Sequence, residues 1–196
     1  MPKASQALVA DETLMLAYRD GEAGAFDTLY QRHRSGLFRF IRRQMTHDSH
    51  AEEVYQDVWM RVIDARAGYE PKAKFTTWLY TIAHNRMMDY FRSSSRAKLV
   101  SLDAASPNSD GEAPIELPAP ETARPDIGLE RKMLAGRILA ALDALPPDQR
   151  EAYLLQEEGE LSVEEIAQAT GVNRETAKSR LRYALTKLRR DLVGLR

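Results

Sequence analysis

The sequence predicts an all-α fold made of two small helical domains, and three observations support this prediction. Apolar residues recur at a spacing of three or four along most of the chain, which is the period of an amphipathic helix. No Asn-Gly or Asp-Gly pair lies between alternating apolar runs, as a β-hairpin would require. A stretch rich in proline and acidic residues interrupts the helical pattern after the first 98 residues. We therefore expect a flexible acidic linker between two domains.

The helices of the first domain follow from five apolar segments, 14–18, 25–29, 37–41, 54–62 and 78–87. Within residues 51–63 the apolar side chains fall on one face, and acidic and amide side chains remain for solvent or a partner. Residues 75–92 mix apolar side chains with threonines, aromatics and bases. Basic residues interleaved with aromatic residues suit the binding of single-stranded nucleic acid, although aromatic residues at helical spacing more often belong to a core.

The linker is predicted from composition. Five of the nine prolines lie between residues 103 and 128, and large apolar side chains are almost absent there. Such a segment cannot bury enough surface to offset the entropy lost on ordering. We assign residues 1–98 to the N-terminal domain, 99–128 to the linker and 129–196 to the C-terminal domain.

The net charge of −1 conceals a separation of charge in the C-terminal domain. Residues 143–165 hold eight acids and one arginine, whereas residues 173–196 hold eight bases and two acids. The acidic part is expected to form supporting helices, one of which starts at Pro146–Pro147 because proline is tolerated in a first turn. The basic part indicates a polyanionic partner more strongly than the net charge does.

Residues 161–190 have the pattern of a helix-turn-helix. Ser162 and Glu165 form a capping box that opens a short helix. Gly171 suits the left-handed residue that closes this helix, and Asn173 can cap the next one. Two helices joined by a short turn with glycine form a helix-turn-helix, whose second helix enters the major groove of DNA.

The second helix of this motif has an apolar stripe and an opposite polar face, as helical geometry at about 100° per residue shows. Side chains of the polar face and of the first turn can bond base edges or phosphates. These candidate DNA contacts are Arg174, Thr176, Lys178, Ser179, Arg182 and Tyr183. A solvated basic helix is the alternative, and the turn chemistry favours DNA binding.

Composition also excludes several classes of protein. The chain has no cysteine, which excludes disulfide scaffolds, thiolate zinc sites and cysteine nucleophiles. No apolar run approaches the roughly 20 residues of a membrane span, and the first residues lack the pattern of a secretory signal. We expect a cytoplasmic protein.

Four segments together resemble the extracytoplasmic-function (ECF) sigma factors of bacterial RNA polymerase. They read GEAGAFDTLYQRH, AEEVYQDVW, FTTWLYTIAHN and LSVEEIAQATGVNRETAKSRLR, and their order and spacing agree with that family. The resemblance implies a protein without catalytic activity, cofactor or metal that binds core RNA polymerase and directs promoter-specific transcription initiation. It also implies control by an anti-sigma factor.

The resemblance further implies roles for particular residues. The helix from Glu52 to Asp64 would bind a coiled coil of the largest polymerase subunit, and the C-terminal helix would read the −35 element as duplex. The N-terminal domain would melt the −10 element and capture a flipped base. The implied polymerase contacts are Glu53, Gln56 and Asp57, and the implied −10 contacts are Tyr69, Lys72, Lys74, Asn85 and Arg86.

Two other functions fit parts of the sequence. A dimeric helix-turn-helix repressor or activator would share the C-terminal motif and match palindromic sites, but it leaves AEEVYQDVW and FTTWLY without a role. A metal-dependent hydrolase would have to use a scattered set of acids and histidines whose spacing is not that of a metal site. These residues are His47, Asp48, His50, Glu53, Asp57 and His84.

Overall fold

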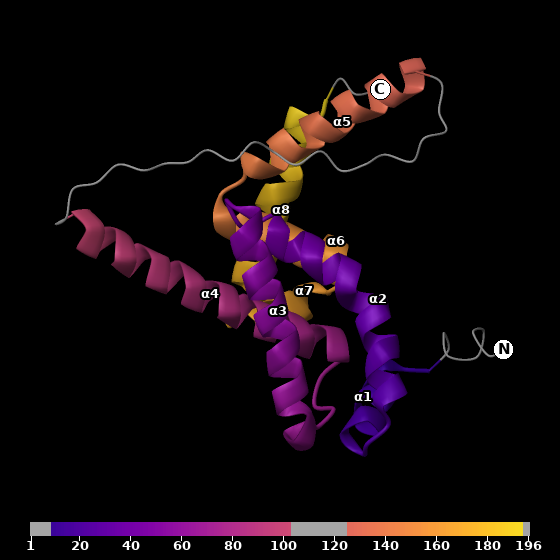
Figure 1. The fold of residues 1–196 in the computed structure, drawn as a ribbon. Helices are drawn as coiled ribbons and strands as arrows, with labels where there is room; N and C mark the ends of the chain where they lie inside the picture. The colour runs from indigo at the N-terminus through magenta and orange to yellow at the C-terminus, as the bar shows by residue number, and fades with distance from the viewer. Residues whose placement is uncertain (1–8, 103–124, 194–196) are drawn as a thin grey trace.

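A computed structural model of the protein describes residues 9–102 and 125–193, and these residues form helices and no strand (Figure 1). The all-α prediction is therefore confirmed, while most of the predicted linker lies outside the described residues. No described helix is both long and apolar enough to cross a membrane. The elements are α1 (Asp11–Arg19), α2 (Ala23–Arg42), α3 (Asp48–Asp64), the short 3-10 helix η2 (Ala65–Gly68), α4 (Phe75–Leu102), α5 (Pro125–Asp143), α6 (Pro147–Gly159), α7 (Val163–Thr170) and α8 (Arg174–Asp191).

Helices α1 to α4 form the N-terminal domain around the apolar faces that the sequence predicts. Helix α2 packs against α1 and α3, and α3 packs against α4. Polar contacts fix the start of two of these helices. Glu12 accepts a hydrogen bond of 2.6 Å from the backbone N–H of Phe75 and so caps the first turn of α4. Asp11 lies 2.5 Å from Nη1 of Arg32 and 2.7 Å from Nε2 of His33, which ties α1 to α2.

The C-terminal domain contains the predicted helix-turn-helix. Ser162 and Glu165 bond each other's backbone N–H groups in a capping box, and Gly171 closes α7 with φ +67°. Oδ1 of Asn173 accepts a hydrogen bond of 2.8 Å from the N–H of Thr176 at the start of α8. Pro147 is the first residue of α6, also as predicted. The apolar stripe of α8 is buried against α5, α6 and α7.

Helix α4 is longer than the pattern of residues 75–92 indicates. It continues to Leu102, so the chain leaves the N-terminal domain as a helix (Figure 1). The reason is visible in the sequence, because no glycine or proline follows until Pro107 and helices run on without such stop signals.

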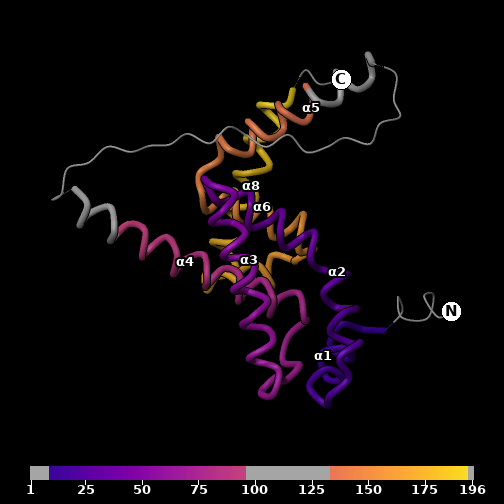
Figure 2. The backbone as a smooth tube through the Cα atoms, in the orientation of Figure 1, coloured from indigo at the N-terminus to yellow at the C-terminus, as the bar shows by residue number. Residues whose placement is uncertain are grey.

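The two domains, which the sequence separates by a linker, lie against each other. Helix α4 contacts α6 and α7, and α2 contacts α6; Figure 2 shows the tubes of α2 and α6 beside each other. Buried side chains of both domains join in one hydrophobic core. The contact is close: a Cβ at Gly36 would lie 2.9 Å from the carbonyl oxygen of Glu158, and one at Gly159 would lie 2.9 Å from the ring of Tyr80. At these two glycines the lack of a side chain lets the two domains approach closely.

Candidate nucleic-acid and polymerase interfaces

Helix α8 presents an exposed basic face away from the core. Lys178 and Arg182 are exposed, and Lys178 has no ion pair with any described residue. The guanidinium of Arg182 lies 5.1 Å from the ring centroid of Tyr183, which is itself 54% exposed. Ser179 and Thr176 are half-buried, and the Ser179 hydroxyl donates to the Thr176 carbonyl at 3.0 Å. The first three turns of α8 therefore offer exposed cations on the side from which a recognition helix contacts base edges.

Arg174 is engaged within the helix-turn-helix. Its guanidinium pairs with Glu164 of α7 and lies 3.2 Å from Glu175. The hydrogen bond to Glu164 raises the pKa of Arg174 and lowers that of Glu164. All three side chains are more than half exposed, and exposed ion pairs of this kind are weak. Little free energy therefore holds Arg174 to Glu164.

The residues implied for the −10 element fall into two groups. Tyr69, Lys72 and Lys74 lie in the loop between η2 and α4, whereas Asn85 and Arg86 lie on α4. Along α4, the second group is about 15 Å from Phe75 at the helix start, at 1.5 Å per residue. Of the five, Lys72, Lys74 and Asn85 are exposed.

Tyr69, which the resemblance implies for the −10 element, is part of the N-terminal core. It is 3% exposed, and its ring packs edge-on against Trp78 with 5.0 Å between centroids. Burial, followed by the charges of Glu12 and Asp11, raises the pKa of Tyr69 to about 12. Its hydroxyl is buried without a hydrogen-bond partner among the described residues. In this conformation the ring has no open face on which a base could stack.

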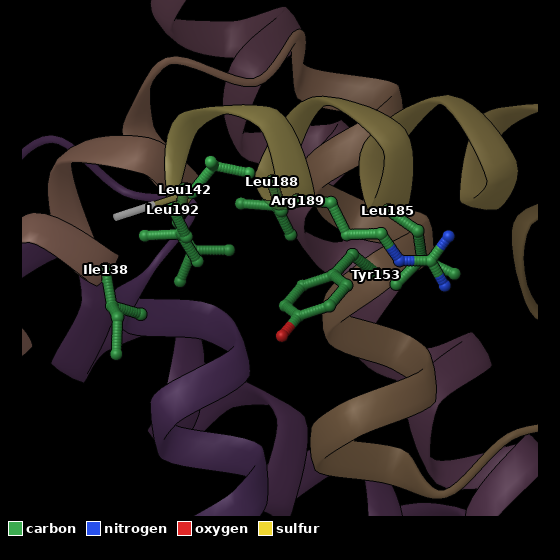
Figure 3. A pocket seen from close by; sticks show the side chains of 8 residues that line it. Ile138, Leu142, Tyr153, Leu185, Leu188, Arg189 and Leu192 are labelled. Atoms are coloured by element: carbon green, nitrogen blue, oxygen red, sulfur yellow. The ribbon is translucent and has the colours of Figure 1, made fainter. Parts of the chain in front are cut away.

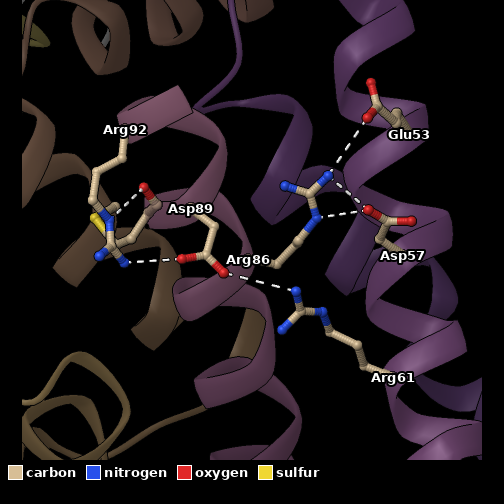
Figure 4. Close-up of polar contacts among 7 residues, drawn as sticks. Glu53, Asp57, Arg61, Arg86, Asp89 and Arg92 are labelled. Carbon is tan, nitrogen blue, oxygen red and sulfur yellow. Dashed lines mark hydrogen bonds and ion pairs between the residues drawn. The ribbon is translucent and has the colours of Figure 1, made fainter. Parts of the chain in front are cut away.

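Helix α3 carries the residues implied for polymerase binding on one outward face. Glu53 and Gln56 are exposed, and the Asp57 side chain is 45% exposed. Arg86 reaches this face from α4: its Nε and Nη2 each lie 2.6 Å from Oδ2 of Asp57, and Nη2 lies 3.5 Å from Glu53 (Figure 4). The structure thus joins a predicted DNA contact, Arg86, to two predicted polymerase contacts.

A set of polar contacts crosses the boundary between the domains. The Tyr80 hydroxyl donates to the backbone carbonyl of Glu158 at 2.8 Å, and Arg39 pairs with the Glu158 carboxylate at 2.7 Å. Tyr80 is 1% exposed, and this burial raises its pKa. Nδ1 of His84 lies 2.7 Å from Glu151, which is 5% exposed. Tyr80 and His84 of α4 are thereby covered by α6.

Lys74 extends this boundary to the helix-turn-helix. Its ammonium lies 2.9 Å from Glu165, the residue that also caps α7 through the N–H of Ser162. Burial raises the pKa of Glu165, but the hydrogen bonds from Ser162 and Lys74 outweigh it and the net shift is downward. One of the three loop residues implied for the −10 element is therefore held by the C-terminal domain.

The sequence reasoning missed this boundary, although one signal for it was present. Thr77, Tyr80 and His84 are among the polar and aromatic residues of the segment 75–92, and Thr77 and Tyr80 are at most 1% exposed. Their spacing of three and four marks a second buried stripe on α4. Glu151 and Glu158 on α6 gave no such signal, because acidic side chains in a helix ordinarily face solvent.

The residues that could imitate a hydrolase are distributed over separate contacts. His84 pairs with Glu151, His50 lies 2.6 Å from the Tyr90 hydroxyl, and Asp57 pairs with Arg86. Within the described ranges, no group of three such side chains could hold a metal ion. An apolar pocket on the C-terminal domain is shown in Figure 3, and it assembles no acid–base pair. Its lining is Ile138, Leu142, Tyr153, Leu185, Leu188, Arg189, Leu192 and Val193.

Two family models match the chain. Sigma-70 region 2 matches residues 29–97, and Sigma-70, region 4 matches residues 135–188. The first match contains the acidic face of α3, the following loop and most of α4. The second contains α6 and the helix-turn-helix up to Leu188.

Curated relatives and solved structures match almost the whole chain. The RNA polymerase sigma factor CarQ of Myxococcus xanthus is 33% identical over 180 residues, which are 92% of this chain and 95% of that protein. The ECF RNA polymerase sigma factor RpoE of Cereibacter sphaeroides is 31% identical over 181 residues, which are 91% of this chain and 93% of that protein.

Two structures share the fold. The sigma factor RpoE in complex with the anti-sigma factor NepR from Bartonella quintana has a TM-score of 0.68 at 24% identity, over 87% of this chain and 98% of that one. CnrH in complex with the cytosolic domain of CnrY has a TM-score of 0.64 at 23% identity, over 94% of this chain and 97% of that one.

Proposed function

Because the chain belongs to the ECF sigma factors of the sigma-70 family, we propose that it binds core RNA polymerase and directs promoter-specific transcription initiation. The observation that carries this proposal is the pairing of two surfaces on one chain. An acidic face on α3 lies within the region 2 match, and an exposed basic face on α8 lies within the region 4 match. A repressor or activator needs only the second of these surfaces.

We infer that α8 reads the −35 element as duplex DNA. Lys178 and Arg182 are exposed cations in the first turns, where a recognition helix reaches base edges. Tyr183 and the half-buried Ser179 and Thr176 lie beside them, and Arg174 can exchange Glu164 for a phosphate. Arginine and lysine pair with guanine or with phosphate, so both affinity and sequence preference can arise from this face.

The N-terminal domain is proposed to engage both polymerase and the −10 element. Glu53, Gln56 and Asp57 form an acidic and amide surface suited to a basic partner. Lys72 and Asn85 are exposed and can meet phosphates or a flipped base. Tyr69 would serve as a wall of the base pocket only after the loop 67–74 moves, because its ring is buried in this conformation.

Promoter binding requires the two domains to separate. Elements labelled −35 and −10 lie about 25 base pairs apart, or roughly 85 Å at 3.4 Å per base pair. In the closed arrangement α4 touches α7, and Lys74 is paired with Glu165 across the boundary. We propose that the segment 99–128 supplies the chain length for this separation.

The protein is proposed to act in the cytoplasm and to have no catalytic activity of its own. The family consists of transcription factors that act through the polymerase. The acids and histidines that could imitate a hydrolase lie in separate contacts, which supports the proposal that the chain is not a catalyst. Two proteins of the same fold are bound to anti-sigma factor NepR and to CnrY in their structures, which supports control of this chain by an anti-sigma factor.

Transcription from a pooled promoter library tests the proposal. Core polymerase from the source bacterium is incubated with the full chain and a linear library that is random between −40 and +1. We expect transcripts that depend on the chain, from templates that share two short sequence blocks. Initiation no greater than with core polymerase alone would contradict the proposed function.

A further inference from the structure

Arg86 has a different environment from the other residues implied for the −10 element. Its side chain is 14% exposed and lies between α3 and α4 (Figure 4). Both of the donors that contact Asp57 go to the same oxygen, Oδ2, and Nη2 also lies 3.5 Å from Glu53. A guanidinium with two donors committed to one carboxylate is poorly placed to reach a DNA base or phosphate.

The geometry leaves acceptor capacity on the carboxylates that Arg86 holds. An ionised carboxylate has about four lone-pair positions, and no described residue bonds Oδ1 of Asp57. Asp57 is 45% exposed and Glu53 is 58% exposed. The neighbouring Glu52 is exposed as well. Three carboxylates against one arginine leave this face negative, so it suits a lysine or arginine of a partner.

We propose that Arg86 is a positioning residue for polymerase binding and not a DNA contact. From α4 it fixes the Asp57 carboxylate in one orientation on α3, so that Oδ1 points outward before the partner arrives. Preorganisation of this kind raises affinity because less side-chain freedom is lost on binding. It also joins the polymerase face to the helix implied for melting. This inference rests on the proposed function.

Neighbouring charges on the same two helices provide a matched control. Arg92 lies on α4 as well, and it pairs with Asp89 at 2.9 Å, is 71% exposed and does not contact Asp57. Arg92→Ala therefore removes one positive charge from the same helix while leaving the Arg86–Asp57 pair intact. A general effect of charge on polymerase binding would appear in this variant too.

A double-mutant cycle on the full chain tests the proposal. Affinity for core polymerase without DNA is measured by fluorescence anisotropy for the wild type, Arg86→Ala, Asp57→Asn, the double variant and Arg92→Ala. We expect Arg86→Ala to weaken binding about tenfold, Arg92→Ala less than about twofold, and the double variant no more than Asp57→Asn alone. Arg86→Lys, which keeps the charge, should recover part of the loss.

Three outcomes would overturn the proposal or its premise. If Arg86→Ala weakens polymerase binding as much in the Asp57→Asn variant as in the wild type, Arg86 does not act through Asp57. If Arg86→Ala binds polymerase as tightly as the wild type does but binds single-stranded −10 DNA more weakly, Arg86 is a DNA contact. Failure of the wild type itself to bind core polymerase would refute the proposed function instead. If Arg86→Ala lowers the midpoint of thermal unfolding, the cycle is repeated with Arg86→Gln, and the same criteria apply.

Discussion

Gly36→Ala should open the contact between the two domains. Gly36 lies within α2, and a Cβ there would stand 2.9 Å from the Glu158 carbonyl oxygen and 3.3 Å from the Tyr80 hydroxyl oxygen. The added methyl therefore enters the hydrogen bond between Tyr80 and Glu158, which is 2.8 Å long. Ordinary contact begins near 3.4 Å, so α2 and α6 have to move apart by about half an ångström.

The magnitude follows from two terms. Overpacking of a close contact costs about 1–3 kcal/mol, and loss of the hydrogen bond from Tyr80 to Glu158 costs about 1 kcal/mol. Alanine is favoured over glycine in a helix by about 1 kcal/mol, but this gain is present in the closed and open forms alike and cancels. The equilibrium should therefore shift toward the open form by about 2–4 kcal/mol, which is roughly 30-fold or more.

Energy transfer between two dyes measures this equilibrium. The chain has no cysteine, so cysteines introduced at the exposed Asp27 of α2 and Gln168 of α7 can be labelled without competition. Gly24→Ala is the matched control, because Gly24 lies in the same helix and a Cβ there meets nothing within 4 Å. We expect lower transfer efficiency for Gly36→Ala and no change for Gly24→Ala. Equal efficiencies in the two variants would refute the reasoning about this contact.

Three further predictions concern the two proposed interfaces and the contact between α1 and α2. Lys178→Ala and Arg182→Ala should each weaken binding of a −35 duplex by about 1–3 kcal/mol in a filter or anisotropy assay, and Arg190→Ala, at the far end of α8, should not; equal losses in all three would argue for unspecific electrostatics. Asp57→Asn should weaken binding to core polymerase but leave −35 duplex affinity unchanged, and loss of both would contradict separate interfaces. Asp11→Asn should lower the free energy of unfolding by about 1 kcal/mol at pH 7, measured with urea.

The pH dependence of the last effect has a defined sign. Burial raises the pKa of Asp11, but hydrogen bonds from His33 and Arg32 outweigh it, so the folded-state pKa lies below the ordinary value of 3.8. A carboxylate with a lowered pKa stabilises the fold above its unfolded-state pKa, and this stability disappears as pH falls through the folded-state value. The difference between wild type and Asp11→Asn should therefore narrow below about pH 3.8. A constant difference from pH 7 to pH 3 would contradict this account.

Local signals in the sequence were sufficient for the helix-turn-helix. The side chains of Ser162 and Asn173 each cap a helix by accepting from the N–H three residues later, and Gly171 adopts a left-handed conformation without a Cβ clash. Such interactions depend on neighbours in sequence, so the structure reproduces them closely. The stripe of buried residues on α8 likewise follows from helical geometry alone.

Contacts between distant segments could not be predicted in the same way. The partner of Arg86 depends on how α3 and α4 align, and Asp57 is 29 residues away in sequence. The contact between the domains also joins residues far apart in sequence, since Tyr80 and Glu158 are separated by 78 positions. A polar side chain at helical spacing can be exposed to solvent or buried and hydrogen-bonded. Which of the two applies depends on whether another helix packs against it.

Gel filtration with core RNA polymerase, at moderate salt and without DNA, tests the central claim most directly. We predict that the full chain elutes with the polymerase as a one-to-one complex, because the acidic face of α3 is exposed in the closed arrangement. Elution of the chain apart from the polymerase, as a homodimer that binds duplex DNA, would contradict the account and identify a dimeric helix-turn-helix regulator instead.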